Sequence, residues 1–258
     1  MNTLKKKLYN NKISLGSWIT IGSTVVAEIF AKAGFDWLVI DLEHTTIDIN
    51  TAGELIRVID LCGVTPLVRL TSNKNDQIKR VMDAGAHGVV VPMVNSAGEA
   101  KQAVNATRYA PEGVRGVGLA RAQGYGATFN EYLRWQKDNP IVIVQIEHKD
   151  AIVNIDEILS VPGIDGLIIG PYDLSCSLGI PGQFDNSEFV DIMASIRDSG
   201  LRHNCPVGLH IVEPDLDKMN DIITQGYTFI AYSVDIRMLD LSARNGVMNC
   251  ASAISRNK

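Results

Sequence analysis

Eight short apolar runs, with helical stretches between them, constrain the fold of this chain more than any other feature. Most of these runs are continuous and rich in Val, Ile and Leu, which is typical of parallel strands buried on both faces. We predict strands at residues 14–21, 37–43, 65–70, 88–94, 141–147, 166–171, 206–211 and 229–235. Helical spacing follows most of them, at residues 25–33, 52–61, 76–84, 97–109 and 216–225.

This alternation of strands and helices predicts a parallel sheet with right-handed crossovers. Eight such units favour closure into a (β/α)8 barrel, the TIM-barrel fold. The alternative is an open doubly wound sheet, which normally has a glycine-rich phosphate loop after its first strand. Residues 21–24 read Ile-Gly-Ser-Thr and lack that pattern, so the barrel is the better interpretation.

Length and composition fit one barrel domain. We expect a single domain over residues 1–258, with its last helix at about 238–255. A net charge of −5 argues against a nucleic-acid partner. There is no apolar run of the roughly 20 residues that a membrane helix needs, and Lys5-Lys6-Lys7 does not begin a signal peptide. We therefore expect a cytoplasmic protein without a membrane partner.

Polar side chains gather at the carboxyl ends of the predicted strands, where a barrel has its active site. They are Asp41, Glu43 and His44 at the end of the second strand, Arg69 at the end of the third, Gln145 and Glu147 at the end of the fifth, and Asp173 after the sixth. Strand periodicity puts Gln145 and Glu147 on one side of their strand. Charges at the end of a buried strand are costly unless they are paired or bound to a metal.

Glu147 and Asp173 follow adjacent strands and could share one cation. Carboxylate oxygens with open coordination positions suit Mg²⁺, Mn²⁺ or Co²⁺. Two structural alternatives stay open: Glu147 could form a buried ion pair with Arg69 or His148, and Asp173 could simply cap a helix. His44, beside this cluster, is a candidate general base. Arg69 could stabilise a developing oxyanion.

Several segments carry a resemblance to a known family, in order and at sensible intervals between residues 16 and 182. They are residues 33–44, 68–69, 91–94, 108–109, 113–118, 144–147 and 169–175. On these segments the chain resembles the HpcH/HpaI aldolases, metal-dependent pyruvate aldolases that include 4-hydroxy-2-oxoheptanedioate aldolase. The resemblance implies a barrel of the phosphoenolpyruvate/pyruvate-superfamily type.

The resemblance also implies a reaction. A class II aldolase of this kind reversibly cleaves a 4-hydroxy-2-oxo acid to pyruvate and an aldehyde, through a metal-stabilised pyruvate enolate and without an organic cofactor. The implied roles are His44 as proton acceptor, Arg69 for transition-state stabilisation, Asp83 to raise the basicity of the histidine, Glu147 and Asp173 as metal ligands, and Gln145 with the backbone of Tyr172 and Asp173 for oxo-acid binding.

Asp83 raises a geometric problem, because it ends a predicted helix and so belongs at the face opposite the active site. The glycine-rich segment 113–126 has the same difficulty. We expect both to reach the catalytic face of a neighbouring subunit, and the resemblance implies a homo-oligomer, commonly a hexamer. Residues 209–214 depart from the family pattern, in a region that should border the aldehyde.

Three other functions fit the sequence less well. A Schiff-base aldolase needs a desolvated lysine inside the barrel, but the predicted strands carry none in their interiors and Lys149 lies just past the fifth. A CoA-ester lyase of the citrate lyase β-subunit type needs basic groups for a nucleotide tail, and no such cluster is visible. A non-catalytic ligand-binding barrel would not be expected to keep His44, Arg69, Glu147 and Asp173.

Overall fold

Eight parallel strands close into a barrel in sequence order, and β8 pairs with β1 to complete it. The computed structural model describes residues 3–256 of the chain. The strands are β1 (Ser14–Ile19), β2 (Trp37–Asp41), β3 (Thr65–Arg69), β4 (Gly88–Val91), β5 (Ile141–Ile146), β6 (Gly166–Ile169), β7 (Val207–Ile211) and β8 (Phe229–Val234). The predicted (β/α)8 barrel is therefore confirmed.

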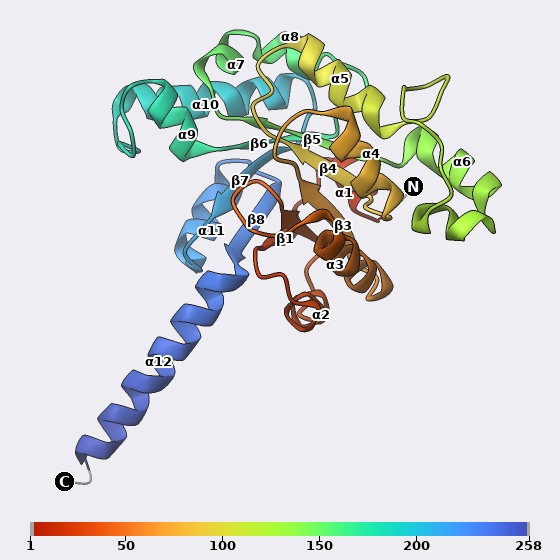
Figure 1. Cartoon of the computed structure of the whole chain (residues 1–258). Helices are drawn as coiled ribbons and strands as arrows, with labels where there is room; N and C mark the ends of the chain where they lie inside the picture. Colours follow the sequence, from red (N-terminus) through yellow and green to blue (C-terminus); the bar gives the residue numbers. More distant parts are fainter. Residues whose placement is uncertain (1–2, 257–258) are drawn as a thin grey trace.

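Helices follow the strands and pack around the barrel (Figure 1). They are α1 (Thr3–Tyr9), α2 (Thr24–Lys32), α3 (Ile49–Leu61), α4 (Asn75–Asp83), α5 (Ala97–Thr107), the 3-10 helix η1 (Arg121–Gly126), α6 (Phe129–Asp138), α7 (Lys149–Val153), α8 (Ile155–Leu159), α9 (Pro171–Ser177), α10 (Ser187–Arg202), α11 (Leu216–Thr224) and α12 (Asp235–Arg256). Side-chain caps start several of them: the Asp48 carboxylate, for example, accepts from the backbone N–H of Thr51 at 2.8 Å.

The barrel interior is filled by alternate residues of the strands. Trp37 stacks on Phe229 with ring centroids 4.1 Å apart. Gly16 leaves room for this stack, because a Cβ at that position would lie 2.0 Å from the Trp37 ring. Leu4 and Leu8 of α1 belong to the same buried cluster, so α1 closes the amino-terminal end of the barrel. The carboxyl-terminal end of the barrel is not covered by this helix.

The observed strands end one to three residues before several of the predicted ends. The fourth shows the physical reason: Pro92 has no N–H for the ladder, and Met93 adopts a left-handed conformation with φ +53°. The residues that follow a strand end thus belong to loops, although their sequence resembles that of the strand before them. This matters because the turned residues build the site described below.

Helix α12 behaves differently from the other helices, since it projects away from the barrel instead of packing along it (Figure 1). Apolar side chains are exposed on it, including Leu239, Val247 and Ile254. Across residues 3–256, no helix combines the length and the apolar character that crossing a membrane requires. The assignment of the whole chain to one domain remains a prediction.

Candidate active site

Inward-facing residues at the carboxyl ends of the strands form the walls of the barrel mouth. Alternation along β2 turns Trp37, Val39 and Asp41 to the interior, and register pairs Asp41 with Arg69, the last residue of β3. The Arg69 guanidinium donates from Nε to Asp41 Oδ1 at 2.8 Å and from Nη2 to Asp41 Oδ2 at 2.7 Å. It also lies 4.4 Å from the ring centroid of Trp18. Asp41 is buried, so this two-point contact fixes the arginine rigidly.

Glu43 and His44 lie on the loop that follows β2. Glu43 Oε2 is 3.4 Å from Arg69 Nη1 and 3.8 Å from His44 Nε2. Burial raises the pKa of Glu43 to about 7, against the lowering effect of Arg69, and the charges of Asp41 and Asp173 add to the rise. The His44 side chain is 64% exposed, so its imidazole can reach a molecule in the mouth.

Glu147 directly follows β5 and is almost fully buried. Its Oε1 accepts a hydrogen bond of 2.7 Å from the backbone N–H of Met93, and its Oε2 accepts one from the side-chain amide of Gln145. The left-handed turn at Met93, which costs about 1–2 kcal/mol, aims that N–H at the carboxylate. Burial raises the pKa of Glu147 to about 7 despite these donors, and Glu43 and Asp173 contribute to the rise.

Asp173 lies in the first turn of α9, immediately after β6. Its charge acts on both Glu43 and Glu147, so the three acids share one region of the mouth. Gly170 joins β6 to α9, and its lack of a side chain lets the backbone there approach Glu147 and Gln145. A Cβ at this position would lie 2.8 Å from Glu147 Oε2 and 3.2 Å from Gln145 Nε2. Within residues 3–256, no hydrogen bond ties the Asp173 carboxylate to the helix backbone, so it does not serve as a helix cap.

The buried ion pair considered for Glu147 is also absent from the described residues. Arg69 is engaged by Asp41 and Glu43, and His148 Nδ1 lies 3.4 Å from Asp150. Glu147 instead has only neutral donors around it. This leaves a buried carboxylate without a positive partner among the described residues, which is a costly arrangement.

A cavity of about 270 Å³, here called the mouth cavity, is lined by several of the predicted residues, and Glu147 lies behind its lining against Gln145 and Gly170. Its lining includes Trp18, His44, Arg69, Gln145, Asp173 and His210. His210 Nε2 donates to the carbonyl of Ser233 at 3.0 Å, and burial lowers the pKa of His210 to about 4. This histidine is therefore neutral near pH 7.

Sequence reasoning missed three parts of the mouth: Trp18 under the arginine, Asp41 as the partner that holds it, and the backbone N–H of Met93. Trp18 sits at an inward position of the first predicted strand, so strand parity could have found it. The contact from Met93 depends on an unusual backbone turn that the sequence does not signal.

Asp83 is the one predicted site residue that the chain does not bring to the mouth. It ends α4, just before β4 begins, and so lies at the amino-terminal end of the barrel. Its Oδ1 is 3.8 Å from Arg115 Nε, and burial raises its pKa while Arg115 and Lys79 oppose the rise.

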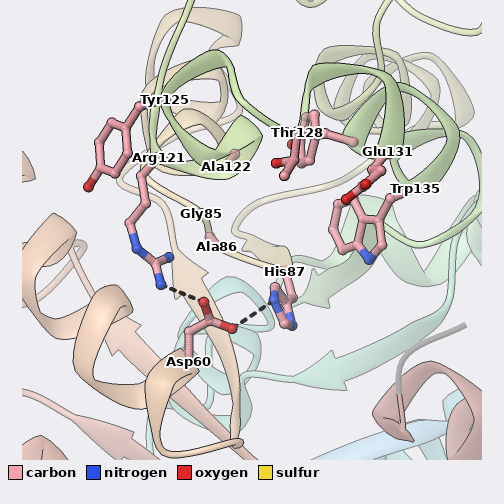
Figure 2. A pocket seen from close by; sticks show the side chains of 11 residues that line it. Asp60, Gly85, Ala86, His87, Arg121, Ala122, Tyr125, Thr128, Glu131 and Trp135 are labelled. Carbon is pink, nitrogen blue, oxygen red and sulfur yellow. Dashed lines mark hydrogen bonds and ion pairs between the residues drawn. The ribbon is translucent and has the colours of Figure 1, made fainter.

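The segment 113–126 lies at the same end as Asp83. Arg121 of η1 donates to Asp60 at the end of α3, and Asp60 also contacts His87 at 3.1 Å (Figure 2). These contacts border a cavity of about 500 Å³ on the amino-terminal side. Within one chain, Asp83 and segment 113–126 thus lie at the end of the barrel opposite the active site, as the sequence predicts.

The fold and the position of this site define a (β/α)8-barrel enzyme. The chain belongs to the HpcH/HpaI aldolase/citrate lyase family, whose model matches residues 14–240. Membership confirms the predicted resemblance and the prediction of an aldolase, a carbon–carbon lyase.

Similar proteins extend over nearly the whole chain. A 4-hydroxy-2-oxo-heptane-1,7-dioate aldolase of Shigella sonnei is 38% identical over 248 residues, which are 94% of this chain and 92% of that protein. A 2-keto-3-deoxy-L-rhamnonate aldolase of Escherichia coli O17:K52:H18 is 37% identical over 239 residues, 91% of this chain and 87% of that protein. The crystal structure of a family member from Burkholderia cenocepacia superposes with a TM-score of 0.92 at 30% identity and covers 97% of this chain and 100% of its own.

Proposed function

We propose that this enzyme is a metal-dependent aldolase that reversibly cleaves a 4-hydroxy-2-oxo acid to pyruvate and an aldehyde. The observation that carries the proposal is the state of Glu147. It is a buried carboxylate with only neutral donors, and the charge of Asp173 acts on it. A divalent cation between the two acids would compensate both charges, and similar proteins of the family are named as aldolases of oxo acids.

The residues at the mouth fit such a cation. Glu147 and Asp173 supply hard oxygen donors, and the buried Oε1 of Gln145 lacks a hydrogen-bond partner in the described structure. No group of three or more His, Cys, Asp or Glu suited to a metal occurs among residues 3–256. The protein would thus provide two carboxylates and leave the other positions to substrate and water. Mg²⁺, Mn²⁺ and Co²⁺ suit this donor set, and when bound they supply Lewis-acid polarisation of the 2-oxo group.

Arg69 would stabilise the negative charge that develops on the 2-oxo oxygen as the C3–C4 bond breaks. Its two bonds to Asp41 and its stacking on Trp18 hold the guanidinium in place before the substrate arrives. A donor fixed in advance needs no reorganisation during the reaction, which is why such groups contribute strongly to catalysis. Gln145 and the backbone N–H groups of Tyr172 and Asp173 would orient the oxo acid.

His44 would take the proton from the 4-hydroxyl group of the substrate. Its imidazole borders the mouth cavity and has Glu43 beside it, so a positive charge gained by the histidine has a carboxylate nearby. In the reverse direction the same group returns the proton to the aldehyde oxygen as the new bond forms.

A homo-oligomer would complete this arrangement, with a hexamer as the expected size. Asp83 and segment 113–126 would then approach the mouth of a neighbouring subunit, and Asp83 would raise the basicity of its His44. The projecting α12 supports assembly, because Leu239, Val247 and Ile254 are exposed to solvent in the single chain. A helix with apolar residues in the open is typical of an interaction surface.

We also infer a cytoplasmic location. Cys62, Cys176, Cys205 and Cys250 are free thiols, as is usual in a reducing compartment.

The test is a panel of 4-hydroxy-2-oxo acids incubated with the enzyme, read by pyruvate formation with Mg²⁺, Mn²⁺ or Co²⁺ and with a chelator. The proposal expects pyruvate that appears with the metal and disappears with the chelator. Borohydride trapping in the presence of pyruvate separates it from a Schiff-base enzyme, which would be labelled covalently. The residues described around the mouth cavity include one arginine and no lysine, which disfavours both the lysine mechanism and a CoA-ester lyase.

A further inference from the structure

A second hollow, here called the side cavity, opens beside the mouth cavity and has a volume of about 660 Å³. It lies between α10 and α11, outside the end of β7. The two cavities share four lining residues: Pro171, Tyr172, His210 and Val212. Tyr172 belongs to α9 and Val212 directly follows β7, so the two cavities adjoin at these side chains.

The walls of the side cavity are mainly apolar and aromatic. Phe184 meets Tyr172 edge to face, with ring centroids 4.9 Å apart, and packs on Phe189 at 5.5 Å. Met193, Leu209 and other apolar side chains from α10, β7 and α11 complete the lining. Aromatic rings packed in this way keep a cavity open and preformed, as is common in sites for small molecules.

Four charged side chains also line the side cavity: Arg197, Glu213, Lys218 and Asp221. Arg197 pairs with Asp198 at 2.9 Å, and Glu213 pairs with Arg237 at 2.6 Å. Two of the four lining side chains are positive and two are negative, so the lining has no net charge to offer a charged ligand. The side cavity therefore suits an apolar group.

We propose that the side cavity binds the part of the substrate that leaves as the aldehyde, and that this part is an apolar or aromatic group on C4 of the 4-hydroxy-2-oxo acid. The inference rests on the proposed aldolase function, because the oxo-acid end must lie in the mouth cavity for C4 to face Tyr172 and Val212. The four lining residues that the two cavities share favour a substrate as the occupant over a segment of another protein.

Two non-reacting 2-oxo acids test this without turnover: pyruvate and 2-oxo-4-phenylbutanoate. Calorimetric titration of the Mn²⁺-loaded protein should show that the phenyl compound binds at least about tenfold more tightly, since a filled apolar pocket discriminates by that order. Ala194 lines the side cavity, so Ala194→Phe should abolish this advantage and leave pyruvate binding within about twofold. Ala194→Leu should reduce the advantage by less.

Ser195→Phe is the matched control, because Ser195 is the next residue of α10 and is exposed outside the side cavity. It should leave both affinities unchanged. Equal binding of the two acids to the unmodified protein would overturn the inference, and so would an Ala194→Phe protein that retains the phenyl preference or weakens both ligands equally. A change of oligomeric mass in Ala194→Phe alone, measured by sedimentation, would assign the hollow to a subunit contact instead.

Turnover separates failure of this inference from failure of the proposed function. Pyruvate release is compared for 4-hydroxy-2-oxo-4-phenylbutanoate and 4-hydroxy-2-oxopentanoate. Release from neither acid, together with tight phenyl binding, rejects the aldolase while the side cavity keeps its ligand class. Release from the short acid with no effect of Ala194→Phe on either substrate rejects the inference alone.

Discussion

Replacing Gly170 by alanine should weaken metal binding more than it weakens the fold. The added Cβ would lie 2.8 Å from Glu147 Oε2 and 3.0 Å from Glu147 Cβ. Neither can retreat easily, because Met93 and Gln145 hold the carboxylate and the residue is buried. Either the Glu147 carboxylate or the start of α9 must therefore shift, which changes the position of Glu147 relative to Asp173.

The magnitudes follow from this geometry. Inserting a methyl group into a packed site costs about 1–3 kcal/mol of unfolding free energy, which lowers the melting temperature by about 2–4 °C per kcal/mol in a chain of this size. Displacing a metal ligand through its surroundings typically reduces affinity about 10–100-fold. We therefore expect a folded protein whose Mn²⁺ affinity falls by one to two orders of magnitude.

The assay is calorimetric titration with Mn²⁺, accompanied by thermal unfolding of the metal-free protein. Gly98→Ala is the control, since the nearest neighbour of a Cβ at that position is Ser96 Oγ at an ordinary 3.8 Å. It should change neither quantity much. A Gly170→Ala protein that binds Mn²⁺ as the unmodified protein does would refute the reasoning, because Glu147 would then not depend on the space that glycine leaves.

Three further predictions concern the other residues of the mouth. Arg69→Ala should lower kcat by about 10²–10³. Arg69→Lys should not restore it, because lysine cannot make the two-point contact with Asp41. An Arg69→Ala protein that keeps more than about a tenth of the activity would contradict the role of Arg69. His44→Ala and Asp83→Asn proteins, each inactive, should regain activity when they are mixed and reassembled, and no recovery would argue against a site shared between subunits. Burial raises the pKa of Glu43 from 4.5 to about 7, so the Glu43 carboxyl group holds its proton more tightly in the folded protein than in the unfolded chain. The stability that this protonation contributes is complete below about pH 4.5 and is lost as the pH rises through about 7. Thermal unfolding of metal-free Glu43→Gln should show a flatter profile over that range, and a profile parallel to that of the unmodified protein would count against the buried acid.

Strand periodicity was sufficient to predict the barrel and most of the mouth. Inward parity placed Gln145 and Glu147 together, and helix direction placed Asp83 at the opposite end of the single chain. These inferences succeed because a buried strand alternates its side chains strictly, and because a helix in a barrel returns the chain to the other face.

Details that depend on register and on local backbone turns could not be predicted in this way. The contact between Arg69 and Asp41 requires the pairing of β2 with β3, which periodicity within one strand does not specify. The turn at Met93 and the projection of α12 are not signalled by the sequence either, since the sequence of α12 is that of an ordinary helix.

The position of Trp18 gives the enzyme a built-in optical probe. Of the three tryptophans in the sequence, Trp37 stacks on Phe229 inside the barrel and Trp135 stacks on Tyr132 at the other end. Trp18 alone borders the mouth cavity, directly beneath the guanidinium of Arg69. A charged ligand bound beside this arginine changes the electric field on the indole, so the emission of Trp18 can report occupancy in real time without a label.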